Sequence, residues 1–173
     1  MRIVPLESGR EPLLSPDIVW DAERGVGDLA VSPLSDPVNP GGLTAENAIQ
    51  TAVIICLMTD RRVEPEELRD GEVNKGWPGD SFDLEPGETA LGSRLWQLRR
   101  RALDDGIERE AEAYAREALA TLIDQGVCVR TDVTASADPA RNYLALEVAL
   151  YGRQGASIFQ QRFAVLWDQV DRR

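Results

Sequence analysis

The fold is decided by the stretch from Ile107 to Thr134, which reads IEREAEAYAREALATLIDQGVCVRTDVT. In its first part apolar side chains recur at helical spacing, and Gly126 is well suited to end a helix. After the glycine, apolar and polar residues alternate, as in a half-buried strand. The stretch therefore predicts a helix over residues 107–125 and a strand over residues 127–134.

The predicted helix has two chemically different sides, which is typical of a helix that packs on a core. Its apolar side consists of Ile107, Ala111, Tyr114, Ala118 and Leu122. We expect the polar side to face water, with Glu108, Glu112 and Arg116.

More strands follow this helix in the sequence. Apolar and small or polar residues alternate again over residues 143–151, and residues 157–163 can form a third strand. The segment between the first two strands, residues 135–142, has the composition of a hairpin loop, and residues 164–169 are expected to form a closing helical turn. The pattern predicts a small antiparallel sheet.

The first half of the chain adds helices and a hairpin. Residues 45–58 form an Ala-rich helical pattern behind Thr44, which we expect to be its N-cap. This helix is apolar on almost every side, so it is either central or covered by a partner. A shorter helix is predicted over residues 91–101, and residues 17–21 and 28–31 are expected to pair as a β-hairpin. The fold class is α+β, with two to three helices on a small antiparallel sheet, an N-terminal hairpin and an extended arm.

Charge and length define the organisation of the chain. The 173 residues suit a flexible arm over residues 1–16 and a single α+β domain over residues 17–173. The net charge of -11 comes from residues 1–90, which hold 18 acidic and 7 basic residues and include an acidic loop over residues 60–90. Such a charge argues against binding to nucleic acid or to an anionic membrane. No apolar run is long enough to span a bilayer.

Several chemistries are disfavoured by the residue inventory. The chain has no histidine, which removes Ser-His-Asp and Cys-His catalysis. Cys56 and Cys128 lie in apolar runs and are expected to be buried free thiols. The acidic stretch from Asp70 does not fit a calcium loop, because Lys75 and Ser81 stand where glycine and glutamate are needed. We expect no metal and no cofactor.

The remaining candidates are contact residues. Arg61 and Arg62 can tie the acidic loop down or pair across an interface, and Trp77 with Asp80 can form a lid or a binding surface. Trp96 can be a core residue or, with Arg94, an interface anchor. The full set of interface candidates is Arg61, Arg62, Trp77, Asp80, Arg94, Trp96, Phe159, Phe163 and Trp167.

The order of several short motifs resembles a known family. The motifs are TDRR at residues 59–62, GWPGD at 76–80, LGSRLW at 91–96 and YAREAL at 114–119, followed by Phe163, Leu166 and Trp167 near the end. In this order they resemble the baseplate protein family of Mu-like phages, the product of the forty-sixth gene. The resemblance extends from about Asp17 to Trp167.

The resemblance implies a structural role without enzymatic activity. Members of that family are similar in role to the small lysozyme-like wedge protein of T-even phages, a sheath initiator. The implied function is to link the baseplate wedge and hub to the first sheath ring of a contractile tail. The implied partners are wedge and hub or spike proteins and the tail sheath and tube proteins, in the virion baseplate and, during assembly, in the host cytoplasm. We expect the edge of the C-terminal sheet to face the sheath, by strand addition.

Two other classes remain open from the residues alone. An acidic inhibitor or immunity-type protein would use the charged first half to mask a basic partner. A hydrolase could use the carboxylates that surround Trp77, namely Asp80, Asp83, Glu85 and Glu88.

Overall fold

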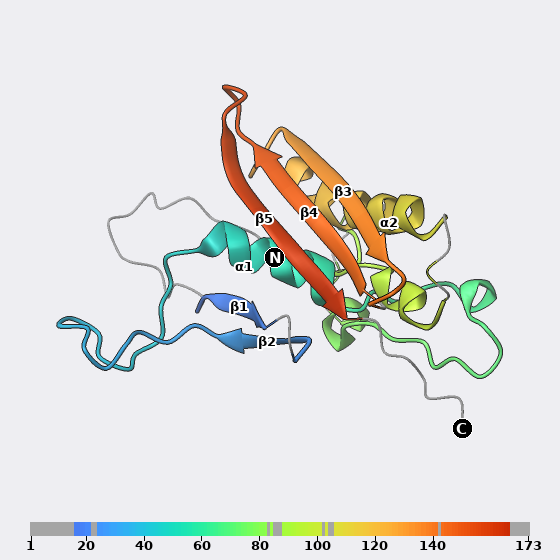
Figure 1. Cartoon of the computed structure of the whole chain (residues 1–173), viewed down its shortest axis with the longest axis horizontal. Helices are drawn as coiled ribbons and strands as arrows, with labels where there is room; N and C mark the ends of the chain where they lie inside the picture. Colours follow the sequence, from blue (N-terminus) through green and yellow to red (C-terminus); the bar gives the residue numbers. More distant parts are fainter. Residues whose placement is uncertain are drawn as a thin grey trace.

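The structure is a computed structural model that describes residues 16–21, 24–82, 84, 88–101, 103, 106–141 and 143–166. The described chain is an α+β fold with two α-helices, a two-stranded hairpin and a three-stranded antiparallel sheet (Figure 1), which confirms the predicted fold class. In this part of the chain neither helix is both long and apolar enough to cross a bilayer. The predicted arm lies outside the described residues except for Pro16, and Trp167 also lies outside them.

The three-stranded sheet contains β3 (Arg130–Asp138), β4 (Tyr143–Tyr151) and β5 (Ser157–Leu166), with β4 in the centre. Both pairings are antiparallel. Every second side chain of β4 from Leu144 to Leu150 is fully buried and belongs to the core. The alternation seen in the sequence is therefore the core-facing row of the central strand.

The sheet is longer than the sequence patterns predicted. Strand β3 starts at Arg130 and continues through residues 135–138, which were expected to form a hairpin loop. The predicted helical turn is wrong at residues 164–166, because these residues pair with β4 as the end of β5. Continued pairing satisfies the backbone groups of both strands, and this outweighs the local turn signals. Residues 167–169 lie outside the described part.

Helix α2 (Ile107–Asp124) forms where it was predicted. It ends in a Schellman motif: Gly126 has φ of 72°, its amide donates to the Ile123 carbonyl, and the amide of Val127 donates to the Leu122 carbonyl, both at 2.9 Å. Its buried side chains are Ile107, Ala111, Ala115, Ala118, Leu119 and Leu122, while Tyr114 is half-buried.

Helix α1 (Ala48–Met58) lies in the core, which is one of the two alternatives that its apolar composition left open. It contacts α2 on one side and β1 (Ile18–Asp21) on another. The helix starts three residues later than predicted, and Thr44 is not its N-cap. The Thr44 hydroxyl instead donates to the Asp17 carboxylate, because residues before the helix run extended beside the hairpin.

The N-terminal hairpin consists of β1 and β2 (Val26–Leu29), with Ile18 opposite Leu29. The second strand starts two residues earlier than predicted and ends at Leu29. Just beyond it, the Ala30 amide donates to the Asp17 carbonyl, and the Ala30 carbonyl accepts from the Thr44 amide. The chain on either side of the hairpin is therefore joined to the segment that leads into α1.

The acidic loop contains short regular turns. Two 3₁₀ helices, Pro65–Glu67 and Pro78–Ser81, lie within it. The helix predicted over residues 91–101 is a 3₁₀ helix restricted to Leu95–Arg100. It cannot begin earlier, because the backbone before it is held in an isolated parallel bridge between Asp60 and Ser93.

Candidate functional site

The segments that carry most of the candidate residues are held side by side at the end of α1. The amide of Arg61 donates to the Ser93 carbonyl, and the amide of Ser93 donates to the Thr59 carbonyl, both at 2.9 Å. The Ser93 hydroxyl also donates to the Leu57 carbonyl at 2.5 Å. These bonds join residues 57–61 to the segment that begins at Ser93, some 30 residues later in the sequence. We call residues 57–61 and 93–96 together the platform.

Arg94 is the centre of a charged network on this platform. Its guanidinium donates to Glu117 of α2 at 2.6 Å and 3.0 Å and to Glu67 of the acidic loop at 2.9 Å. It also lies 4.4 Å from the centre of the Tyr114 ring. Arg61 donates to the other carboxylate oxygen of Glu117 at 3.0 Å. Both arginines therefore fix the acidic loop and the end of α1 to α2.

The environment of Arg94 favours its charged form. Burial alone would lower the pKa of this guanidinium, but the hydrogen bond and charge of Glu117 raise the pKa above its ordinary value. Arg62 differs, because its side chain is exposed. Of the two adjacent arginines, Arg62 is the one that presents its side chain to solvent.

Trp96 is a core residue of the platform. It is 6% exposed, and its indole N–H donates to the Arg61 carbonyl at 2.9 Å. The Lys75 ammonium lies 5.7 Å from the centre of the ring. The side chain therefore fastens the acidic loop to the body of the protein.

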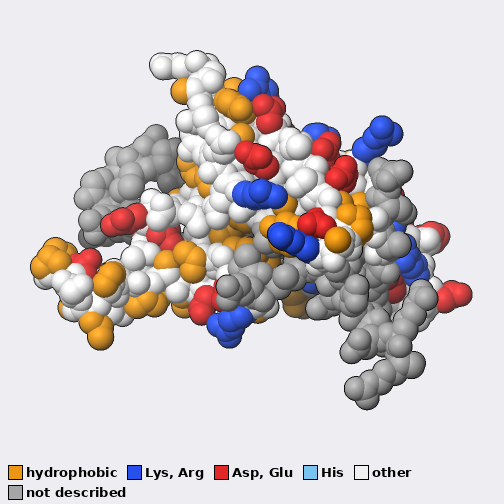
Figure 2. Space-filling view, in the orientation of Figure 1, with side chains coloured by type: hydrophobic (Ala, Val, Ile, Leu, Met, Phe, Trp, Pro, Cys, Tyr) orange, Lys and Arg blue, Asp and Glu red, His pale blue; other side chains and the backbone are white. Residues whose placement is uncertain are grey.

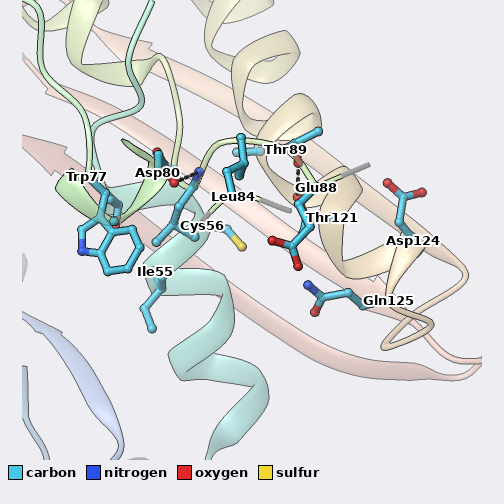
Figure 3. Close-up of a pocket in the computed structure, with 15 residues that line it drawn as sticks. Ile55, Cys56, Trp77, Asp80, Leu84, Glu88, Thr89, Thr121, Asp124 and Gln125 are labelled. Atoms are coloured by element: carbon cyan, nitrogen blue, oxygen red, sulfur yellow. Dashed lines mark hydrogen bonds between the residues drawn. The ribbon is translucent and has the colours of Figure 1, made fainter. Parts of the chain in front are cut away.

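Trp77 and Asp80 line a pocket of about 710 Å³ between α1, the acidic loop and α2 (Figure 3). Trp77 remains 48% exposed, and its ring lies over Gly79. One oxygen of Asp80 accepts from the Leu91 amide at 3.2 Å, and the other is buried without a hydrogen-bond partner. Carboxylates of Glu88 and Asp124 also line the pocket.

Both cysteines of the chain lie in buried positions. Cys56 and Cys128 are buried free thiols, as predicted. Burial raises the pKa of Cys56 to about 11 and raises that of Cys128 as well, so both thiols stay protonated near neutral pH. Among the described residues no three acidic or cysteine side chains converge as metal ligands.

The candidates on β5 have different degrees of burial. Phe163 is 1% exposed and belongs to the core, while Phe159 is partly buried. Their ring centres are 6.4 Å apart. Trp167 follows β5 outside the described residues.

The sequence predicted that the polar side of α2 faces water, but side chains on this side bond to the backbone of β3. Glu112 accepts from the Ala135 amide at 3.1 Å, and Glu108 accepts from the Ala137 amide at 2.7 Å. Arg116, which was also expected to face water, donates to the Val133 carbonyl at 2.8 Å. These side chains occupy the outer edge of β3, because α2 runs alongside that strand.

The fold thus groups some candidates and separates others. Arg61, Arg94 and Trp96 lie in one platform, and Trp77 with Asp80 lines the adjacent pocket. The phenylalanines of β5 lie apart from them on the sheet. The sequence did not reveal the role of the buried Asp17, which is one of three aspartates in the two segments predicted to form the hairpin.

A family model and two curated relatives match the chain. The model, described as phage protein GP46, matches residues 49–157. The Mu-like prophage FluMu protein gp46 of Haemophilus influenzae is 34% identical over 151 residues, which cover 87% of this chain and 97% of the relative. The baseplate protein gp46 of Escherichia phage Mu is 35% identical over 144 residues, which cover 82% of this chain and 89% of the relative.

Proposed function

The chain belongs to the phage protein GP46 family, and from that premise we propose that it links the wedge and hub of a contractile-tail baseplate to the first sheath ring. Its role is that of a structural baseplate protein, and its place is the virion tail. The proposed partners are wedge and hub or spike proteins on one side and sheath and tube proteins on the other. Assembly would take place in the host cytoplasm.

The observation that carries the sheath contact is the difference between the two edges of the sheet. The β3 edge is occupied by side chains of α2, which bond to the backbone at Val133, Ala135 and Ala137. Strand β5 pairs with β4 alone within the described residues. An edge strand of this kind offers a row of backbone donors and acceptors to a strand of another protein.

The sequence of β5 supports this use of its edge. Proteins usually protect a free edge with proline, several charges or a short strand. Strand β5 has ten residues, no proline and one charged residue, Arg162. Its composition therefore favours strand addition.

The platform supports a second contact, with the wedge or hub. The ion pairs of Arg94 and Arg61 with Glu117 hold the acidic loop in place, so its exposed side chains are presented on a fixed support. We propose Arg62 and Trp77 as contact residues there, because both are exposed. No catalytic step forms part of the proposal. The inhibitor alternative is less favoured, since both curated relatives are phage gp46 proteins.

A test of the sheath contact uses single proline substitutions in the middle of β5. Successive backbone amides of a strand point to opposite sides, so one of Gln160 and Gln161 directs its N–H toward β4 and the other toward the open edge. Gln160→Pro and Gln161→Pro therefore form a matched pair. Removing residues 157–173 would be less informative, because it takes Phe163 out of the core.

The pair is measured by thermal unfolding and by co-expression with the sheath protein encoded nearby. We expect one variant to lose stability and the other to keep its melting temperature but fail to start sheath assembly. If the variant that keeps its melting temperature starts sheath assembly normally, β5 is not the sheath contact.

A further inference from the structure

The segment between β2 and α1 forms an ordered projection, residues 30–44, which we call the apolar arm. Its two limbs run antiparallel: the Thr44 amide donates to the Ala30 carbonyl at 3.1 Å, and the Ser32 amide donates to the Gly42 carbonyl at 2.8 Å. Figure 1 shows this segment extending away from the sheet, beyond β2. The arm is a built structure with its own hydrogen bonds.

The root of the apolar arm is clamped by a buried carboxylate. Asp17 is 2% exposed and accepts hydrogen bonds from the amides of Glu46 and Asn47 at 2.7 Å and 2.9 Å and from the Thr44 hydroxyl at 3.1 Å. Its own amide donates to the Thr44 carbonyl at 2.8 Å. This clamp fixes the direction in which the arm leaves the body.

The tip of the apolar arm is held by a second set of bonds. The Asp36 carboxylate accepts from the amides of Val38 and Asn39 at 2.8 Å and 2.9 Å, and its own amide donates to the Pro33 carbonyl. The side-chain amide of Asn39 donates to the Leu43 carbonyl at 3.0 Å. The turn is therefore pre-organised without help from the rest of the fold.

This ordered tip presents apolar side chains to solvent. Leu34 is 87% exposed and Val38 is 90% exposed, more than any other large hydrophobic side chain in the described part of the chain. Val31 and Leu43 on the limbs are also exposed. Figure 2 shows the resulting cluster of hydrophobic side chains on the projection. Fixed, exposed apolar side chains of this kind mark a contact surface.

The charge pattern limits what the arm can contact. Asp36 is the only charged residue from Leu29 to Ala45, and its carboxylate is engaged with the backbone of the tip. Asp28 and Glu46 stand on either side of this uncharged stretch. A complementary surface is therefore apolar at its centre and basic at its rim.

We propose that the apolar arm inserts Leu34 and Val38 into an apolar cleft with a basic rim on a different protein of the baseplate. This inference rests on the proposed structural function. A pre-organised tip loses little conformational entropy on binding, so more of the burial energy of its side chains appears as affinity. The convex shape of the tip requires a concave partner.

Two other occupants fit the charge pattern less well. Segments that bind lipid surfaces carry lysine or arginine beside their apolar residues, and this chain has no basic residue between Arg24 and Arg61. A second copy of the chain would bring together two proteins of net charge -11, which repel each other. A different, more basic protein is the occupant that the pattern favours.

The test compares two variants of the full chain that alter equally accessible side chains. The arm variant is Leu34→Ser with Val38→Ser, and the control is Val73→Ser, whose side chain is 82% exposed in the acidic loop. Each is co-expressed with the proteins encoded by the neighbouring tail genes, and the affinity for the co-purifying partner is then measured. We expect the arm variant to keep the melting temperature and to bind at least about tenfold more weakly, and the control to bind normally.

A photo-crosslinking residue at position 38 identifies the occupant directly. A cross-link to an apolar cleft of another tail protein supports the inference. A cross-link to a second copy, a cross-link to residues 1–15 of the same chain, or arm-dependent flotation with phosphatidylethanolamine–phosphatidylglycerol vesicles overturns it.

The failure of this inference is distinguishable from failure of the proposed function. If the unaltered chain co-purifies with tail proteins and the arm variant does so equally well, only the role of the arm is wrong. If the unaltered chain binds none of these proteins, the structural function in the baseplate is wrong.

Discussion

The carboxylate of Glu112 accepts a hydrogen bond from the backbone amide of Ala135 at 3.1 Å, so a helix side chain takes the place of a neighbouring strand. The same relationship recurs one helical turn earlier, between Glu108 and Ala137. Four residues of helix advance about 6.0 Å and two residues of strand about 6.6 Å, so the two ladders stay nearly in step. The match explains why one polar row of α2 can satisfy one edge of the sheet.

Because side chains of α2 bond to the β3 edge, the two edges of the sheet are not equivalent. A partner strand can add only where backbone groups are free. With β3 occupied by α2, the described part of the sheet leaves β5 as the edge for pairing. On the proposed sheath contact, the polar side chains of α2 would leave the β5 edge as the surface that meets a partner.

Glu112→Ala should destabilise the fold by about 1.5–3 kcal/mol at pH 7, because the Ala135 amide loses a charged acceptor. Burial raises the pKa of Glu112, but the hydrogen bond from Ala135 and the charge of Arg116 outweigh burial and lower it below the usual value. The stabilisation is therefore complete above the unfolded pKa of about 4.3 and is lost as the pH falls through the folded pKa. Urea unfolding at pH 7 and pH 3 measures both effects.

Glu112→Gln is the matched control for this prediction. It keeps an oxygen acceptor for Ala135 but cannot ionise, so we expect a smaller loss at pH 7 and little change in that loss with pH. A Glu112→Ala penalty that is the same at both pH values would contradict the role of the charged carboxylate.

Asp17→Ala should lower the free energy of unfolding by about 3 kcal/mol, because it leaves the amides of Glu46 and Asn47 without an acceptor. Burial alone would raise the pKa of Asp17, but these hydrogen bonds lower it, so the stabilisation persists above the unfolded pKa and disappears toward lower pH. Unfolding curves give the change in the free energy of unfolding, and limited proteolysis reports whether the apolar arm loosens.

Asp36→Ala serves as the control for this prediction. The Asp36 carboxylate bonds only within the tip of the arm, so we expect a much smaller loss of stability than for Asp17→Ala.

Strongly periodic segments could be predicted from the sequence, and the partners of polar side chains could not. The alternation on β4 and the helical repeat of α2 follow from burial on one side, which leaves a mark on every second or every third to fourth residue. Thr44 has the chemistry of an N-cap, yet Asp17 engages it from 27 residues away. A local pattern has no information about such a distant acceptor.

The candidate site was predictable to a similar extent. Arg94 and Trp96 stood out by residue type, but their fixing partners, Glu117 and the Arg61 carbonyl, come from other segments. The sequence of residues 33–42 gave no sign of the hydrogen bonds within this segment, because they depend on the geometry of a single turn.

Trp96→Ala should lower the free energy of unfolding by about 3–5 kcal/mol, since it removes a buried indole and leaves the Arg61 carbonyl without its donor. Trp77→Ala is the comparison, and its expected cost is below about 1 kcal/mol because the side chain is half exposed. Chemical denaturation of the two variants checks the ranking. An unchanged melting temperature for Trp96→Ala, together with lost partner binding, would identify Trp96 as an interface anchor instead.

Gly92→Ala should disrupt the platform far more than an ordinary glycine substitution. Gly92 has φ of 102°, and a Cβ there would lie 2.3 Å from the Thr59 carbonyl oxygen, so the two segments would have to separate. Their separation breaks the backbone bonds that join Ser93 to Thr59 and Arg61. We expect a loss of more than about 3 kcal/mol, with faster hydrogen exchange at the amides of Arg61 and Ser93.

Gly126→Ala separates this close approach from backbone strain alone. Gly126 has φ of 72°, and a Cβ added there would meet no atom within 4 Å, so the substitution should cost only about 1–2 kcal/mol and leave exchange at Arg61 and Ser93 unchanged. Both variants are compared by urea unfolding and by exchange monitored with NMR. Equal losses in the two variants would mean that the contact between Gly92 and Thr59 does not hold the platform together, and the ion pairs of Arg94 would then be its main support.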